Sequence, residues 1–271
     1  MFLERDKIQG LIAGVGELPV QVAMAAQKKG FNLICISLST SNRSELAKYC
    51  HKIYSFGPGE LQKILDKLHE NKVHQLTFIG KVSKGILFRN PKLDKKAIAL
   101  IKSMKKLNDD AIMLALTDEL AKEGIEVVDQ TLFIKDLLVK KEVISFLEPD
   151  EHQKIDIEYG FNIAKEIGRL DLGQTVVVQN KMILAVETIE GTDKAIERGC
   201  KLGSGKSIVV KVSKPNQDKR FDIPTVGLGT LKTMKRYGAN VLAIEAEETF
   251  VVEKAKMIEF AKKNNMVIVA V

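Results

Sequence analysis

The candidate functional side chains of this sequence gather in a short segment, residues 211–224, which reads KVSKPNQDKRFDIP. They are Lys211, Lys214, Gln217, Asp218, Arg220 and Asp222. Prolines at both ends exclude a regular helix, so the stretch is expected to be extended or looped. If it is extended, Asp218, Arg220 and Asp222 share one face. Hydrolysis of a phosphoanhydride requires carboxylates that hold magnesium or orient water, beside cations that neutralise developing negative charge. An ion-pair network with a purely structural role explains the same row of charges.

Two more polar clusters precede this segment, at residues 171–174 (DLGQ) and 187–193 (ETIEGTD). They contribute Gln174, Thr192 and Asp193 as candidate ligands for a sugar, a phosphate or a metal-bound water. The four histidines are scattered, and neither an HExxH motif nor a Ser, His, Asp order is present. Zinc chemistry and nucleophilic catalysis are therefore disfavoured, whereas the oxygen ligands favour magnesium or manganese.

A glycine turn near the N-terminus is placed like a dinucleotide-binding turn, since Gly14 and Gly16 follow an apolar run and precede a helical pattern. The fingerprint fails, because Pro19 stands where the third glycine belongs and the run 33–38 ends without an acidic residue for a ribose. A Rossmann-like turn that touches a nucleotide or phosphate through Gly14 and Gly16 is the better interpretation. Residues 203–207 (GSGKS) lack the first glycine of a P-loop and precede a strand, so a structural turn is predicted there.

The order of elements predicts an α/β protein with two domains. Apolar runs alternate with helical patterns in residues 1–130, which favours a Rossmann-like parallel sheet covered by helices. Residues 131–150 break this rhythm and are predicted to form a linker. A second α/β domain is expected from 151 to 271, with a β-hairpin around Asn180 and Lys181.

Composition narrows the class of protein. The 271 residues carry a net charge of +7, which suits nucleic acid, an anionic membrane surface or a phosphorylated substrate. With no tryptophan and 6% aromatic residues, recognition of nucleic acid by stacking is disfavoured. The sequence lacks a signal peptide and any apolar run long enough to span a bilayer, so we expect a cytoplasmic protein that visits the inner-membrane surface. Three cysteines without CxxC spacing predict neither a disulfide framework nor a zinc site.

Several segments, in their order and approximate spacing, resemble the LpxI-type UDP-diacylglucosamine pyrophosphatases. The matching segments are residues 10–19 (GLIAGVGELP), 80–82 (GKV), 156–160 (DIEYG), 168–174 (GRLDLGQ), 185–193 (AVETIEGTD), 214–227 (KPNQDKRFDIPTVG) and 243–246 (AIEA). The resemblance covers nearly the whole chain. The sequence departs from the family pattern at Glu247 and Glu248, where many relatives have a glycine, and this departure concerns the local loop.

The resemblance implies hydrolysis of UDP-2,3-diacylglucosamine to UMP and 2,3-diacylglucosamine 1-phosphate, with Mg²⁺, during lipid A synthesis. It also implies a Rossmann-like N-terminal domain and a substrate site in the C-terminal domain or between the two domains. The family's essential aspartate maps onto Asp222, as a metal ligand or a water-orienting base, and the neighbouring Asp218 is a less secure metal ligand. On chemical grounds, Lys214 and Arg220 are expected to hold the diphosphate with Lys211 nearby.

Three other functions stay open at this point: a non-catalytic nucleotide- or lipid-binding protein on the same fold, a nucleotide-dependent oxidoreductase, and a basic nucleic-acid binder. The retention of Asp222 argues against the first, and the failed glycine fingerprint argues against the second. The phosphorus that water attacks, and whether the protein forms a homodimer, also stay open.

Overall fold

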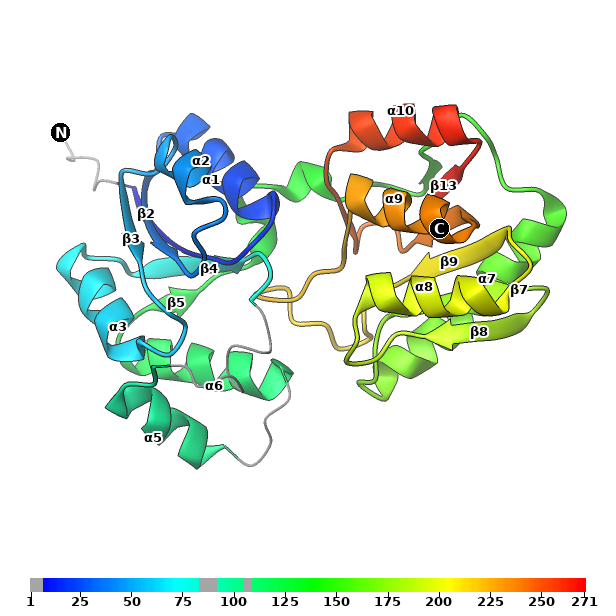
Figure 1. Ribbon diagram of the computed structural model, residues 1–271. Helices are drawn as coiled ribbons and strands as arrows, with labels where there is room; N and C mark the ends of the chain where they lie inside the picture. Colours follow the sequence, from blue (N-terminus) through cyan, green and yellow to red (C-terminus); the bar gives the residue numbers. More distant parts are fainter. Residues whose placement is uncertain (1–6, 83–91, 105–108) are drawn as a thin grey trace. The chain divides into compact units, whose positions relative to one another are not determined.

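The computed structural model describes residues 7–82, 92–104 and 109–271, which form two compact units (Figure 1). The N-terminal unit contains the chain up to Ile134 together with residues 219–221, and the C-terminal unit contains residues 135–218 and 222–271. The chain therefore passes between the units at three places. Two of these crossings flank residues 219–221, inside the segment that carries the candidate chemistry.

The N-terminal unit is built on a parallel sheet with the strand order β3-β2-β1-β4-β5. Its strands are β1 (Ile8–Ala13), β2 (Asn32–Ser37), β3 (Lys52–Ser55), β4 (Gln75–Ile79) and β5 (Glu126–Val127). This is the order of a Rossmann-type sheet, in which the direction of strand addition reverses beside β1. The predicted Rossmann-like parallel sheet is confirmed.

Helices cover both faces of this sheet. They are α1 (Leu18–Lys28), α2 (Arg43–Ala47), α3 (Leu61–Glu70), α5 (Lys95–Ser103) and α6 (Asp109–Lys122). Apolar side chains of α3, α5 and α6 share one buried cluster with β1, β2 and β4, including Leu65, Ala97 and Leu120. Pro19 lies in the first turn of α1, a position that tolerates proline because the missing N–H has no partner within the helix.

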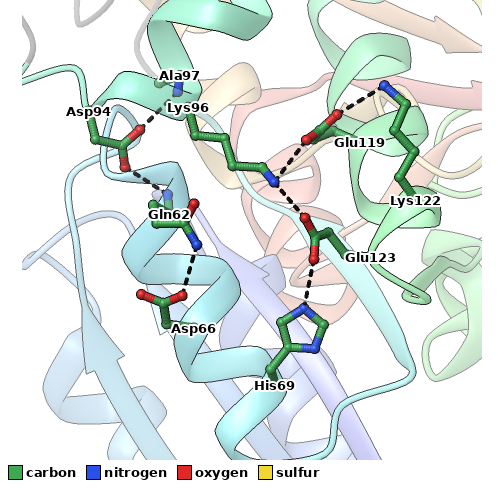
Figure 2. A network of polar contacts seen from close by, with 9 residues as sticks. All are labelled: Gln62, Asp66, His69, Asp94, Lys96, Ala97, Glu119, Lys122 and Glu123. Atoms are coloured by element: carbon green, nitrogen blue, oxygen red, sulfur yellow. Dashed lines mark hydrogen bonds and ion pairs between the residues drawn. The ribbon is translucent and has the colours of Figure 1, made fainter.

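A polar network fastens α5 to α6 and α3 (Figure 2). The ammonium of Lys96 lies 3.0 Å from a carboxylate oxygen of Glu119 and also pairs with Glu123, which in turn contacts His69 at 3.1 Å. These hydrogen bonds raise the pKa of Lys96 and lower the pKa of both glutamates. Asp94 is the N-cap of α5, because its side chain accepts from the Ala97 amide at 2.8 Å. This cap fixes the residue at which α5 begins.

The connection between the two sheets is more ordered than an open linker. It carries the short 3₁₀ turns η1 (Gln130–Leu132) and η2 (Lys135–Leu137), and then β6 (Glu142–Val143), which pairs antiparallel with the last strand. Val139 and Ile144 are buried in the C-terminal unit. Residues 135–150 of the predicted linker thus belong to the C-terminal unit.

The C-terminal unit contains a mixed sheet with the order β6-β13-β11-β9-β7-β8. Besides β6, its strands are β7 (Thr175–Gln179), β8 (Met182–Val186), β9 (Ser207–Lys211), β11 (Ala239–Ile244) and β13 (Val267–Ala270). Strands β9, β11 and β13 run parallel, and β7 is antiparallel to both β9 and β8. Two short strands, β10 (Thr225–Val226) and β12 (Phe250–Val251), pair with each other.

Alternate residues of the central strands enter two separate cores, as the period of two in a strand requires. On one face, Val176, Val178 and Val210 pack against α7 (Glu151–Arg169). On the other, Val177, Val209 and Leu242 belong to a cluster that includes residues of α8 (Thr192–Leu202), α9 (Leu228–Tyr237) and α10 (Lys254–Asn264). Figure 1 shows these three helices on one face of the sheet. A second α/β domain is confirmed.

The predicted hairpin joins β7 to β8 through Asn180 and Lys181, which both have positive φ angles of 52° and 55°. Their amides donate to the two carboxylate oxygens of Asp156 in α7, each at 2.7 Å. Asp156 is 8% exposed, so this residue of the family-like DIEYG segment anchors a turn. The turn at 203–207 lies between the end of α8 and the start of β9, which is the reverse of P-loop order.

No helix among the described residues is long and apolar enough to span a bilayer. Cys35 and Cys200 are buried and Cys50 is half-buried, all as free thiols.

Candidate active site

One edge of the C-terminal sheet collects most of the predicted site residues. The carboxyl ends of β8, β9 and β11 and the start of β7 meet there, because Lys211 pairs with both Thr175 and Ile244 while the Glu187 amide donates to the Thr175 carbonyl at 2.8 Å. Ligands of open α/β sheets bind outside the carboxyl ends of strands. The segments 171–174, 187–193 and 211–214, which are far apart in sequence, all converge at this edge.

The end of β9 and the start of α8 are joined by a short polar chain. Lys211 is 7% exposed, and its ammonium donates to the Thr192 hydroxyl at 3.1 Å and to the Thr225 carbonyl at 3.3 Å. Thr192 in turn donates to Glu187 Oε1 at 2.8 Å. Glu187 is 9% exposed, and its second oxygen is buried without a hydrogen-bond partner among the described residues. A buried cation and a buried carboxylate thus face the first turn of α8.

Close packing between Gly173 and Glu187 fixes this edge. A Cβ atom added to Gly173 would stand 2.1 Å from the Glu187 carbonyl oxygen, a distance no side chain tolerates. Nearby, Glu190 accepts from the Thr188 hydroxyl and pairs with Arg198, and these hydrogen bonds lower its pKa to about 2. Glu190 therefore stays ionised and holds the loop before α8 in place.

The segment after β9 brings Lys214, Gln217 and Asp222 together. The Lys214 ammonium lies 2.7 Å from Asp171 Oδ1 and 3.9 Å from Asp222 Oδ2, and the Gln217 amide donates to the same Asp222 oxygen at 3.4 Å. Gln217 also accepts from the Lys214 backbone amide at 3.2 Å. The Lys214 side chain is 16% exposed and that of Asp222 is 48% exposed, so a half-open carboxylate adjoins a largely buried cation.

Of the two predicted forms of this stretch, the looped one occurs, so Asp218, Arg220 and Asp222 do not share the face that an extended stretch would give them. Turns occur at residues 215–216 and 219–220, and Asp222 has a φ of +68°, so the alternation of an extended strand does not apply. Asp218 and Asp222 belong to the C-terminal unit, whereas Arg220 belongs to the N-terminal unit and lines a cavity of about 440 Å³ beside α6 and β5. The left-handed backbone of a non-glycine residue costs free energy, and such positions cluster at functional sites.

Residues 219–221 are anchored within the N-terminal unit. The Gln130 backbone amide donates to the Lys219 carbonyl at 2.9 Å, and the Gln130 side chain donates to the Phe78 carbonyl at 2.7 Å. Phe221 is 4% exposed. The residue directly before Asp222 is therefore packed as a core side chain.

Two more predicted ligands belong to the converging segments, Gln174 beside the end of β9 and Asp193 on α8. Asp193 is in the first turn of α8, where a carboxylate stabilises the helix dipole, and it lines a hollow of about 280 Å³ with Lys232 and Arg236. Gln174 precedes β7, and its side-chain oxygen is buried without a hydrogen-bond partner among the described residues.

The turn at Gly14 and Gly16 is in the N-terminal unit, directly after β1. A Cβ atom on Gly14 would stand 2.5 Å from the Lys81 carbonyl oxygen, and Val15 forms an antiparallel bridge with Lys81. Gly16 has a φ of +116°, and the Asn42 amide donates to the carbonyl oxygens of Gly14 and Gly16 at 3.2 and 3.1 Å. The turn is tight, as predicted, and its contact with a nucleotide or phosphate stays a prediction.

The donor set suits magnesium held jointly by protein and substrate. No cluster of three or more Asp, Glu, His or Cys side chains with metal-site geometry occurs in the part of the chain that the structure describes. Magnesium usually binds through one or two carboxylates together with substrate phosphates and water, so an all-protein cage is not required. The half-exposed Asp222 fits such a ligand.

Sequence reasoning assigned no roles to Asp171, Glu187, Lys165 and Glu245, which all contribute to this edge. Asp171 and Glu187 lie in the polar clusters 171–174 and 187–193, and their place in these clusters could have identified them from the sequence. Glu245 lies in the family-like AIEA segment. Lys165 gave no signal, because its partners are 48 and 80 residues away in sequence.

Comparisons with known proteins cover both units. The family described as LpxI N-terminal domain matches residues 9–137, and the family described as LpxI C-terminal domain matches residues 140–269. The chain is 31% identical over 263 residues to the UDP-2,3-diacylglucosamine pyrophosphatase LpxI of Caulobacter vibrioides, covering 93% of each chain.

Solved structures give only distant likenesses. An ADP complex of N5-carboxyaminoimidazole ribonucleotide synthetase has a TM-score of 0.30 at 12% identity, covering 69% of this chain and 40% of that one. The biotin carboxylase subunit of pyruvate carboxylase has a TM-score of 0.28 at 11% identity, covering 66% of this chain and 35% of that one. Similarity at this level does not establish a shared activity.

Proposed function

This chain belongs to the LpxI family, and from that membership we propose that it hydrolyses the diphosphate of UDP-2,3-diacylglucosamine in lipid A biosynthesis. Water adds to one phosphorus, the bridging P–O bond breaks, and UMP and 2,3-diacylglucosamine 1-phosphate leave. The observation that carries the proposal is the convergence of Lys211, Lys214 and Asp222 on one unit, at and beside the same sheet edge. A diphosphate needs cations and a carboxylate in this proximity.

We assign the binding of the diphosphate to Lys211 and Lys214. Both ammonium groups are largely buried, and in a medium of low dielectric constant they attract phosphate oxygens more strongly than surface lysines do. Glu187 Oε2 and Gln174 Oε1 have no hydrogen-bond partner in the described part of the chain, and these acceptors suit hydroxyl or amide donors of the substrate. Thr192 orients the Lys211 ammonium through their hydrogen bond. Gln217 contributes by holding Asp222, and Arg220 and Asp193 remain weaker candidates.

We assign the essential carboxylate to Asp222, with two roles open to it. As a base it would orient the attacking water and accept its proton, and as a ligand it would hold Mg²⁺ against the phosphates, with Asp218 as a second oxygen ligand. Bound magnesium would neutralise the charge that develops on the phosphate oxygens. The Lys214 ammonium, 3.9 Å away, places a positive charge beside the Asp222 carboxylate.

The test is release of UMP from UDP-2,3-diacylglucosamine in detergent, with magnesium and with chelator. Asp222→Asn is the sharpest variant, because asparagine also tolerates a left-handed backbone and so removes the charge with little strain. Loss of a general base costs about 10² to 10⁴ in rate. A folded wild-type protein that binds substrate but releases no UMP would favour the non-catalytic binding protein instead.

We further propose that the C-terminal unit meets an anionic membrane surface beside the site. Three aliphatic side chains there are unusually exposed: Ile189 at 81%, Leu170 at 59% and Leu172 at 53%. Leu170 and Leu172 flank Asp171, the partner of Lys214, and the net charge of +7 favours an anionic surface. Serine at these three positions should weaken co-sedimentation with phosphatidylglycerol-containing vesicles by at least about tenfold. Unchanged sedimentation would contradict the proposal.

A further inference from the structure

An ion pair that is not among the proposed substrate-binding residues holds the backbone of Ser213, two residues after the end of β9. Lys165 of α7 lies 2.9 and 3.0 Å from the two carboxylate oxygens of Glu245, the residue after β11. The same ammonium donates to the Ser213 carbonyl at 2.9 Å, and Glu245 accepts from the Ser213 amide at 2.7 Å. Both backbone groups of Ser213 are therefore held by one pair of opposite charges.

The Lys165–Glu245 pair is largely buried and lies where α7 packs against the segment that follows β9. The Lys165 side chain is 28% exposed, that of Glu245 is 17% exposed, and Ser213 is 3% exposed. Three residues after Lys165, on the same face of α7, Gly168 lets the helix approach the segment, since a Cβ there would lie 3.3 Å from Lys214 Cα and 3.4 Å from Pro215 Cδ. One face of α7 thus fits against the start of the segment.

From Ser213 a continuous series of contacts leads to the candidate site. Lys214 follows directly, its backbone amide donates to the Gln217 side chain at 3.2 Å, and the Gln217 backbone amide donates to the Lys214 carbonyl at 3.0 Å. The Gln217 side chain then donates to Asp222 at 3.4 Å. Any rotation of the chain at Ser213 displaces Lys214 first and Asp222 through Gln217.

We propose that Lys165 and Glu245 are a positioning pair for the hydrolysis, setting the direction in which residues 214–222 leave the sheet. The inference rests on the proposed function. Neutral side chains could also form hydrogen bonds to the Ser213 backbone. Charge-assisted hydrogen bonds are shorter and stronger, so the ion pair fixes the geometry at Ser213 more tightly. The side chains of Lys165 and Glu245 bond to each other and to the backbone of Ser213, and the Glu245 backbone amide donates to the Lys211 carbonyl at 3.1 Å, so the pair acts through the end of β9 and the segment that follows it.

The test compares Lys165→Met, Glu245→Gln, the double variant and Lys165→Arg in steady-state release of UMP. Misplacement of catalytic groups by about 1 Å costs up to about 10²-fold, so we expect kcat of Lys165→Met to fall about 10- to 100-fold. KM should change less than about threefold, because neither residue supplies a substrate contact. Lys165→Arg retains charge and donors and should recover most of the activity.

Stability distinguishes positioning from support of the fold. The double variant leaves no uncompensated partly buried charge, so its melting temperature should return toward that of the wild type while its kcat stays low. Met257→Ala, in the core on the opposite face of the sheet, lowers the melting temperature without touching this network and should leave kcat unchanged. Lys254→Met breaks the exposed pair with Glu142 and should leave both quantities unchanged.

Three results would overturn the inference. The first is an unchanged kcat in Lys165→Met with an active wild type, which would leave the proposed function intact. The second is recovery of kcat together with stability in the double variant, and the third is an equal loss of kcat in Met257→Ala. A folded wild-type protein that released no UMP would instead overturn the proposed function and this inference with it.

Discussion

Replacing Gly173 by alanine should distort the candidate site, because the added methyl group has no room beside the backbone of Glu187. The added Cβ would stand 2.1 Å from the Glu187 carbonyl oxygen and 2.8 Å from its carbonyl carbon, whereas ordinary van der Waals contact begins at 3.4 Å. Both obstructing atoms are backbone, so the end of β8 must move by about 1.3 Å, the difference between these contact distances. Glu187 moves with it, and so does the hydrogen bond through Thr192 that orients Lys211.

A displacement of this size should lower kcat/KM for UMP release by about 10²-fold and the free energy of unfolding by about 1–3 kcal/mol. Steady-state kinetics and urea unfolding measure the two quantities on the same samples. Gly229→Ala is the matched control, because a Cβ there meets no atom within 4 Å and its helix should gain about 0.5–1 kcal/mol. Wild-type activity in a folded Gly173→Ala protein would refute the assignment of this edge as the site.

Three further outcomes follow from features outside the reacting groups. Glu247→Gly should raise the free energy of unfolding by about 1 kcal/mol in urea titrations, because Glu247 has a φ of +60°; a decrease would show that its side chain compensates for the strain. Asp156→Asn should cost about 1.5–3 kcal/mol by weakening two charge-assisted hydrogen bonds to the hairpin, while kcat of the folded protein stays unchanged; a lost kcat would give Asp156 a role in the reaction. Lys96→Met should flatten the pH dependence of stability: the lowered pKa values of Glu119 and Glu123 contribute stability above their unfolded pKa of about 4.3, which is lost as pH falls through the folded values. Identical unfolding curves against pH for Lys96→Met and wild type would exclude this linkage.

Local patterns in the sequence predicted the elements well because their causes are local. Asn180 and Lys181 mark the hairpin, since a tight turn requires positive φ at both positions, and asparagine adopts this conformation readily. Buried parallel strands such as β9 read as short apolar runs between helical patterns, which fixed the α/β class. At the departure from the family pattern, Glu247 has a φ of +60°, a left-handed conformation that glycine adopts without strain.

The site was predicted less completely because its contacts are long-range. The pairing of Lys214 with Asp171 joins residues 43 positions apart, and no periodicity signals it. The sequence left residues 211–224 extended or looped, and the looped form occurs, because turns and the left-handed Asp222 interrupt the strand-like alternation. The sequence identified the residue types that phosphoanhydride chemistry needs, and the topology of the sheet determined which of them meet.

The short excursion of residues 219–221 into the N-terminal unit has a consequence for thermal inactivation and for attempts to divide the protein. Phe221 is buried there and Lys219 is hydrogen-bonded to Gln130, although Asp222 belongs to the other unit. Melting of the N-terminal unit alone would release this anchor and free the chain on one side of Asp222. If Asp222 is the essential carboxylate, activity should therefore disappear with whichever unit melts first, and a fragment beginning at Lys135 would lack the anchor directly before Asp222.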